Sequence, residues 1–219
     1  MTIDVPLLNV LVAERTSPSW SRVYEALRVF NLANTDSAAI RQETELVLLN
    51  GAFERALDTS GKEADVAARF AAAFKPGKDV APTSCQRFTK SIDAQKRFKT
   101  SAQLRDVWVR DFFRFRNDLA HGKLDPTYPA LWSLREHLLL ASFALPLLLK
   151  SLLRDDGKYA LTEQDQLHID SFEELACAEH FVPNPKGSFP WNRVIARTER
   201  RQSIAKFIKE YRAAMRGEG

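Results

Sequence analysis

The chain has 219 residues, enough for one well-buried domain with extensions or at most two small domains. Its hydrophobic content of 45% and aromatic content of 10% are those of ordinary globular proteins, and eight glycines and ten prolines are too few for a sandwich built on tight turns. The two cysteines, Cys85 and Cys177, exclude a disulfide framework and favour a reducing compartment.

The net charge of +4 is unevenly distributed. Residues 87–116 hold nine Arg or Lys against three Asp, and residues 191–219 hold eight against three Glu, so the rest of the chain is acidic. Such clusters are typical of proteins that bind a polyanion, although solvated basic helices give the same pattern. The start of the chain lacks a basic region and carries Asp4, which argues against a secretory signal. The apolar run 138–149 is shorter than the roughly 20 residues of a membrane span. We therefore expect a cytoplasmic protein without membrane contact.

Apolar residues recur at helical spacing along most of the chain, which predicts an all-α fold. Ser17 and Pro18 mark a helix start, because proline is favoured at the first helical position. Three helices are expected in this part of the chain, at about 20–30, 37–57 and 63–74. A loop bounded by Pro76 and Pro82 follows, and the basic stretch 86–99 has room for one short helix.

The best-defined helix spans about residues 101–120. Its apolar stripe advances in steps of four, three and four residues through Trp108, Phe112, Phe115 and Leu119. Gly122 is well placed to end this helix in the left-handed conformation. The next helix, expected over 131–153 with a bend at Pro146, is apolar on all sides in its middle. A helix of this kind belongs in the centre of a bundle.

The sequence Asp155-Asp156-Gly157 marks the end of that bundle. We therefore expect a helical bundle over residues 1–155 and a basic helical extension over residues 156–219, packed on the bundle. Helices are expected in the extension at 163–178 and 191–215. In the last helix, four arginines lie in neighbouring rows and can follow a phosphate backbone: Arg193, Arg197, Arg200 and Arg201. Packing of the same helix on the bundle, with its charges in water, is equally compatible with the pattern.

The segment 116–121, Arg-Asn-Asp-Leu-Ala-His, lies at the end of the helix expected over 101–120. An arginine can hold two phosphate oxygens, and a histidine, which titrates near neutral pH, can move a proton. Together they are enough for metal-free cleavage of RNA. Asn117 and His121 are four residues apart and share a helix face, whereas Arg116 and His121 are separated by about 140° of rotation. This geometry permits both side chains to reach one phosphate without requiring it.

The pattern Arg-Asn-x-x-x-His-Gly at the end of an aromatic helix resembles the signature of the HEPN superfamily (higher eukaryotes and prokaryotes nucleotide-binding domain). Residues 112–115, Phe-Phe-Arg-Phe, and Gly122 also resemble that family. The segment 43–57, with its Phe-Glu pair, is similar to the second helix of ApeA-like and abortive-infection HEPN proteins. The resemblance covers roughly residues 20–155. It implies a HEPN-type up-down helical bundle, with additional C-terminal helices, that acts as a metal-independent RNA endonuclease in bacterial defence or a toxin system.

In the family's reaction, the ribose 2′-hydroxyl attacks the adjacent phosphate and leaves a cyclic phosphate. The resemblance implies that His121 acts as general base or acid, that Arg116 stabilises the phosphorane and that Asn117 orients the histidine or the phosphate. Arg114 and Lys123 are the expected RNA contacts. Some HEPN toxins carry, two residues after the His, a Tyr that a partner nucleotidyltransferase modifies; this position is Lys123 here.

The resemblance also implies a homodimer in which two motifs face one cleft, and an antitoxin or regulatory partner. No metal and no cofactor is expected. The main alternative is a non-catalytic HEPN module that binds RNA, a nucleotide or a partner protein. A helical protein-interaction domain without a role in nucleic-acid binding would leave the basic clusters unexplained.

Single residues have other interpretations. A histidine before a glycine, such as His121, is a common arrangement at the end of a helix. Glu54 can form a structural salt bridge with the motif arginine or take part in catalysis. His137 is expected in the core or at its edge.

Three residues near the end of the chain have metal-ligating side chains: Cys177, His168 and His180. Neighbours of this sort on a helix are usually incidental, and we do not expect a zinc site.

Overall fold

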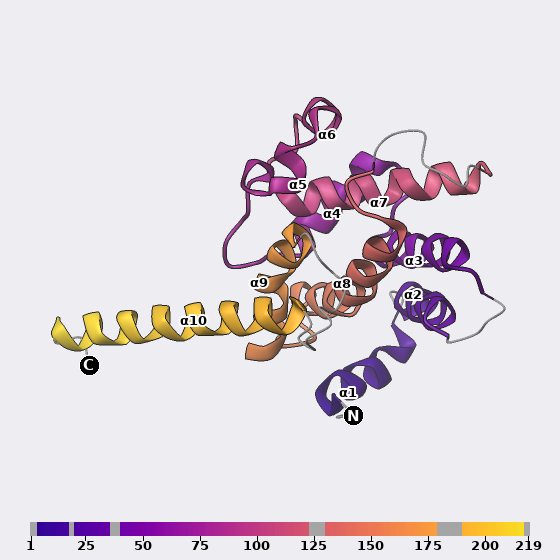
Figure 1. The fold of residues 1–219 in the computed structure, drawn as a ribbon. Helices are drawn as coiled ribbons and strands as arrows, with labels where there is room; N and C mark the ends of the chain where they lie inside the picture. Colours follow the sequence, from indigo (N-terminus) through magenta and orange to yellow (C-terminus); the bar gives the residue numbers. More distant parts are fainter. Residues whose placement is uncertain (1–3, 18–19, 36–39, 123–129, 179–189, 217–219) are drawn as a thin grey trace.

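The computed structural model describes residues 4–17, 20–35, 40–122, 130–178 and 190–216 (Figure 1). Helices make up 77% of the protein and no strand occurs in these ranges, which confirms the all-α prediction. The helices are α1 (Val5–Ala13), α2 (Trp20–Ala33), α3 (Gln42–Leu57), α4 (Glu63–Ala73), α5 (Gln86–Thr89), α6 (Ile92–Arg97), α7 (Leu104–Ala120), α8 (Leu134–Asp155), α9 (Glu163–Cys177) and α10 (Pro190–Met215). Short 3-10 turns lie at Glu14–Thr16 and Pro82–Ser84.

Aromatic rings from four helices form the centre of the core. Trp108 and Phe112, one turn apart on α7, stack with ring centroids 5.3 Å apart, and Phe53 of α3 meets both rings edge-on. Phe172 of α9 packs against Trp108 at 5.1 Å and against Phe70 of α4 at 6.1 Å. All five side chains are fully buried. The predicted stripe of α7 therefore faces the core, and α9 contributes to the same core as the helices that precede it.

The helix expected from Leu131 begins three residues later, at Leu134. The backbone N–H groups of Leu131 and Trp132 donate to the carboxylate of Asp111 on α7, at 3.0 and 3.3 Å, and are thereby held outside the helix. Ser133 then caps α8 through reciprocal hydrogen bonds with the third residue of the helix. A long-range hydrogen bond has overridden the local preference at this boundary.

Other boundaries differ less. α3 begins at Gln42 instead of near residue 37, and the described residues just before it, Ile40 and Arg41, are not helical. Two short helices, α5 and α6, occupy the basic stretch 86–99 where one was expected. α4 and α7 lie within three residues of the expected ranges.

α8 passes through the middle of the bundle (Figure 1). It is long and apolar enough to cross a membrane by length and composition alone, but 56% of its apolar window is buried inside the protein. The helix continues unbroken through Pro146, and the side chain of His137, near its start, is fully buried. His137 is therefore a core residue, within the prediction made for it.

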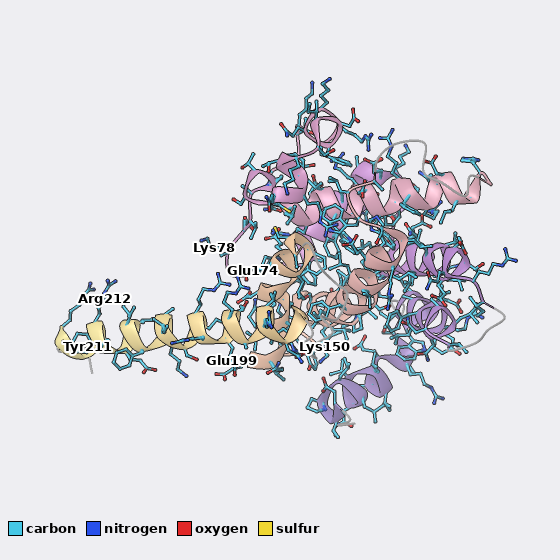
Figure 2. All side chains as sticks on the ribbon, viewed as in Figure 1. Lys78, Lys150, Glu174, Glu199, Tyr211 and Arg212 are labelled. Atoms are coloured by element: carbon cyan, nitrogen blue, oxygen red, sulfur yellow. The ribbon has the colours of Figure 1, made fainter. Side chains whose placement is uncertain are left out.

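The sequence did not predict α1, and none of its residues is buried. Its attachment is polar. The ammonium of Lys150 on α8 lies 2.6 Å from both Asp4, which caps α1, and Asp165 of α9 (Lys150 is labelled in Figure 2). The hydroxyl of Tyr159 donates to the same two carboxylates, at 3.0 and 3.2 Å.

α10 starts against α9 and then projects away from the bundle (Figure 1). In its first half Val194 and Thr198 are buried, and Arg201 forms an ion pair with Glu174 of α9. Gln202 donates to Asp170 of α9. Beyond this point the helix forms an extended arm.

Candidate active site at the end of α7

The last turn of α7 leaves the core and reaches solvent. Phe112, Phe113 and Phe115 are buried, whereas Asn117 and His121 are exposed. Phe115 is the last aromatic residue of the stripe; of the residues that follow it in α7, Leu119 still packs against the core, whereas Asn117 is polar and exposed. Two of the expected catalytic residues, Asn117 and His121, therefore lie at the accessible end of α7.

His121 caps α7. Its backbone N–H donates to the carbonyls of Asn117 at 3.1 Å and of Asp118 at 3.2 Å, so helical geometry persists up to the histidine. Gly122 then has φ +75°, the left-handed conformation expected of a glycine that ends a helix. Because the last turn is regular, Asn117 and His121 lie one turn apart on the same side of α7.

Arg116 is directed towards α3. Its Nη2 donates to Oε1 of Glu54, and its Nη1 donates to Oδ1 of Asn117 at 3.2 Å. The guanidinium also lies over the ring of Phe113, 5.7 Å from the ring centroid. The side chains of Arg116 and Glu54 are 22% and 25% exposed, so the ion pair sits at the rim of the fold where an anion from solvent can reach it.

Gly61, between α3 and α4, approaches this ion pair closely. Its φ is +78°, and a Cβ added there would lie 2.6 Å from Oε1 of Glu54 and 3.6 Å from Nη2 of Arg116. A side chain at this position would displace the carboxylate. The sequence showed Gly61 only as an interruption between helices, and its role depends on how α3 and α7 meet.

An open depression of about 580 Å³ adjoins Glu54 between α2 and α3. Its lining includes both basic and acidic side chains, among them Arg22, Arg55 and Asp58. Arg22 lies 4.0 Å from Asp58, and Arg55 donates to the carbonyl of Gly51. The surface next to Glu54 is therefore a polar depression, and the guanidinium groups of Arg22 and Arg55 line it.

The structure brings together only part of the expected site. Arg116 and Asn117 are in direct contact, and Glu54 joins them. The imidazole of His121 makes no hydrogen bond with any described residue, so its relation to Arg116 rests on the shared end of the helix. Lys123 lies outside the described residues.

Arg114, expected as an RNA contact, is half-buried and faces the start of α4. Burial there raises the pKa of Glu63, and the positive charges of Arg114 and Arg110 oppose this rise. Arg114 therefore lies on a different side of α7 from Arg116, and its charge is partly engaged within the protein.

A histidine–carboxylate pair that the sequence analysis did not identify lies deeper on α7. Nε2 of His137 is 3.4 Å from Oδ2 of Asp111, and both side chains are fully buried. The same carboxylate accepts the two backbone N–H groups at the entry to α8, so the pair joins α7 to α8 and is closed to substrate. The signal for it was a carboxylate at core spacing, three residues after Trp108 and four before Phe115.

Of the three metal-ligating side chains near the end of the chain, His168 and Cys177 lie among the described residues, and each has a different neighbour. His168 bonds to Gln164 at 2.8 Å, and burial lowers the pKa of His168. Cys177 is a free cysteine, and the neighbouring thiol of Cys85 together with burial raises the pKa of Cys177; His180 lies outside the described residues. Within the described ranges, no group of three or more His, Cys, Asp or Glu side chains is arranged to hold a metal ion.

No family model matches the sequence, and no curated protein or solved structure is significantly similar to it.

Proposed function

We propose that the protein is a metal-independent RNA endonuclease of the HEPN type, with its site at the end of α7. The observation that supports this proposal is the presence of an arginine, a carboxamide and a histidine on one accessible helical turn. Arg116 and Asn117 are hydrogen-bonded to each other, and His121 is exposed one turn from Asn117. These groups offer a phosphate clamp, a polar contact and a proton carrier.

The reaction needs no group beyond these side chains and the RNA. The ribose 2′-oxygen attacks the adjacent phosphorus while its proton passes to a histidine. The bond from phosphorus to the 5′-oxygen breaks, and that oxygen takes a proton from an imidazolium. The products are a 2′,3′-cyclic phosphate and a 5′-hydroxyl. Arg116 stabilises the negative charge that develops on the phosphorane oxygens.

A homodimer would supply both the acid and the base. One copy of segment 116–121 carries one histidine, whereas the reaction requires proton transfer at both oxygens. The exposed end of α7 is the surface through which two copies would meet. Light scattering should give the mass of a dimer, and activity should fall on dilution below the dimer dissociation constant. A monomer that stays active at high dilution contradicts this arrangement.

The main experiment tests cleavage directly. Purified protein is incubated in EDTA with an unstructured RNA and with the same RNA carrying 2′-deoxyribose at the cleaved position. Cleavage of the first RNA alone, with cyclic phosphate ends, is the expected result. His121→Ala and Arg116→Ala should abolish it, whereas His168→Ala and Arg28→Ala, which remove the same side-chain types elsewhere, should not. A requirement for a divalent metal, or normal cleavage by the first two variants, would refute the mechanism.

One observation favours the second candidate function, a non-catalytic module that binds RNA, a nucleotide or a partner protein. The carboxylate of Glu54 is hydrogen-bonded to the guanidinium of Arg116, which the reaction needs for the phosphate. A phosphate must therefore displace this carboxylate. Glu54→Gln removes this competing charge and keeps the shape of the side chain. If the protein is an enzyme, Glu54→Gln should change both the affinity for RNA and the rate of cleavage. RNA binding that tightens in Glu54→Gln, with no cleavage by any form of the protein, identifies the binding module.

A further inference from the structure

The exposed face of α10 carries an ordered row of side chains. The row advances in steps of four, three, four, three and four residues through Arg193, Arg197, Arg200, Ile204, Phe207 and Tyr211. At about 100° per residue these positions fall within one narrow sector of the helix. The sector that packs on α9, marked by Val194 and Thr198, is turned from it by about 120°. The row therefore faces solvent along its whole length.

The distal end of this row is apolar and open. Phe207 is 67% exposed and Tyr211 is 58% exposed, and their rings are nearly parallel, with centroids 6.4 Å apart and planes inclined by 22°. Ile204 and Ile208 beside them are 50% and 42% exposed. Large side chains of this kind, gathered on one face of a projecting helix, mark an interaction surface.

The positive charge of α10 indicates which class of partner it can bind. Between residues 190 and 216 there are eight arginines and lysines and two glutamates. Arg193, Arg197 and Arg200 are exposed and form no ion pair with any described residue. Arg212, which follows Tyr211 in the chain, leaves the helix in a different direction in Figure 2, so a cation also flanks the aromatic end. A surface with this excess of positive charge is complementary to a polyanion.

The order of side chains within the row narrows the choice further. A helix that pairs with a second copy, or that lies in a lipid surface, needs apolar residues throughout its seam. Here the first three seam positions are arginines, so half of the seam is not apolar, and a parallel pair would also bring six guanidinium groups together. A single-stranded nucleic acid fits both halves, because its phosphates pair with the arginines and its bases stack on aromatic rings.

We propose that α10 is an arm that binds single-stranded RNA, in which Arg193, Arg197 and Arg200 contact phosphates and Phe207 and Tyr211 stack on bases. The row is about 27 Å long, enough to contact several nucleotides at once. The inference rests on the proposed ribonuclease function, since it assigns a substrate-binding surface to that enzyme. The arm would hold RNA that extends beyond the cleavage site.

The test is a binding measurement in the His121→Ala background, which separates binding from cleavage. Fluorescence anisotropy with a labelled 20-nucleotide oligouridylate gives the dissociation constant and its salt dependence. Phe207→Leu with Tyr211→Leu keeps much of the apolar area and removes the rings. Ile204→Ala with Ile208→Ala is the matched control, because it removes apolar area from the same face and keeps the rings.

The two pairs of substitutions should differ in direction and size. Loss of the two rings should raise the dissociation constant by about tenfold or more, since stacking on each ring contributes substantially to affinity. The isoleucine pair should change it by less than about twofold. Replacing the three arginines of the row by Gln should reduce the slope of log affinity against log salt by about 2, because each phosphate contact contributes about 0.7 for a single strand.

Several results would overturn the proposal. Unchanged affinity in the leucine variant excludes stacking, and a loss in the isoleucine variant as large as that in the leucine variant indicates apolar docking instead. Failure to bind the oligouridylate, together with cosedimentation with vesicles of phosphatidylcholine and phosphatidylserine, assigns the arm to a membrane surface. The proposed ribonuclease function fails independently of the arm if ring-dependent binding is found but the protein with His121 intact does not cleave.

Discussion

Substitution of Gly61 by alanine should disturb the ion pair between Arg116 and Glu54 more than it lowers the stability of the fold. Gly61 adopts φ +78°, where an L-residue costs on the order of 1–2 kcal/mol because its Cβ crowds the backbone. The new Cβ would also lie 2.6 Å from Oε1 of Glu54. This oxygen is at the end of a flexible, partly exposed side chain, so it moves aside at little energetic cost. The contact should therefore change the ion pair more than the free energy of unfolding.

Gly157 offers a matched control. Its φ is +71°, but a Cβ added there meets no atom within 4 Å. Both Gly61→Ala and Gly157→Ala should lower the free energy of unfolding by about 1–2 kcal/mol, which for a protein of this size is a drop in Tm of about 2–8 °C. Scanning calorimetry measures this drop. Only Gly61→Ala should alter RNA affinity and cleavage, because only there is Glu54 pushed away from Arg116.

Two results would refute this reasoning. If neither variant loses stability, the backbone at these positions tolerates a side chain and the conformational argument is wrong. If Gly61→Ala loses stability but binds and cleaves RNA as the wild type does, the close approach of Gly61 has no bearing on the state of Arg116. Equal functional changes in both variants would mean that lost stability, and not the ion pair, alters activity.

Two further predictions concern the core and the attachment of α1. Phe172→Ala should lower the free energy of unfolding by about 3–5 kcal/mol in denaturant titrations, whereas Leu139→Ala on the exposed side of α8 should change it by less than about 1 kcal/mol. Burial opposes ionisation of Asp4 and Asp165, but hydrogen bonds, led by those from Lys150, outweigh it and lower the pKa of both. A carboxyl group with a lowered pKa stabilises the fold at pH values above its ordinary pKa of 3.8, and this stabilisation is lost as the pH falls through the pKa of the folded state. Lys150→Met should therefore lower Tm at pH 7. It should also make the decline of Tm below about pH 4 shallower than in the wild type. A Tm profile parallel to that of the wild type would show that Lys150 does not hold these carboxylates.

The parts of the fold that could be predicted are those in which local spacing and tertiary packing agree. The stripe of α7 is a clear case, since the positions of Trp108, Phe112 and Phe115 require one buried face in any helical packing. The end of the same helix was predicted from Gly122, which adopts the expected left-handed conformation. The sequence thus placed the candidate site at the end of α7, and the structure adds that Asn117 and His121 are exposed there.

The boundaries that could not be predicted depend on contacts between distant residues. The start of α8 is displaced because Asp111, about twenty residues earlier, accepts the N–H groups of Leu131 and Trp132. α1 escaped prediction for a related reason. None of the residues of α1 is buried, so the helix has no buried apolar face that periodicity could reveal. It is attached instead by the ion pair between Lys150 of α8 and Asp4, the residue that caps α1.

The candidate site also depends partly on spacing within one helix and partly on contacts between helices. Spacing within one helix selects Arg116, Asn117 and His121, but the crossing of α3 and α7 decides what the arginine contacts. That crossing supplies Glu54, and the conformation of Gly61 leaves room for its carboxylate. An arginine held by a carboxylate at a partly exposed position keeps its geometry without substrate, and it exchanges one anion for another when a phosphate arrives. Because this exchange replaces one charge pair by another, the net gain from the phosphate at Arg116 is small. Additional cationic surface is then needed for tight binding, and the exposed Arg193, Arg197 and Arg200 of α10 present such a surface.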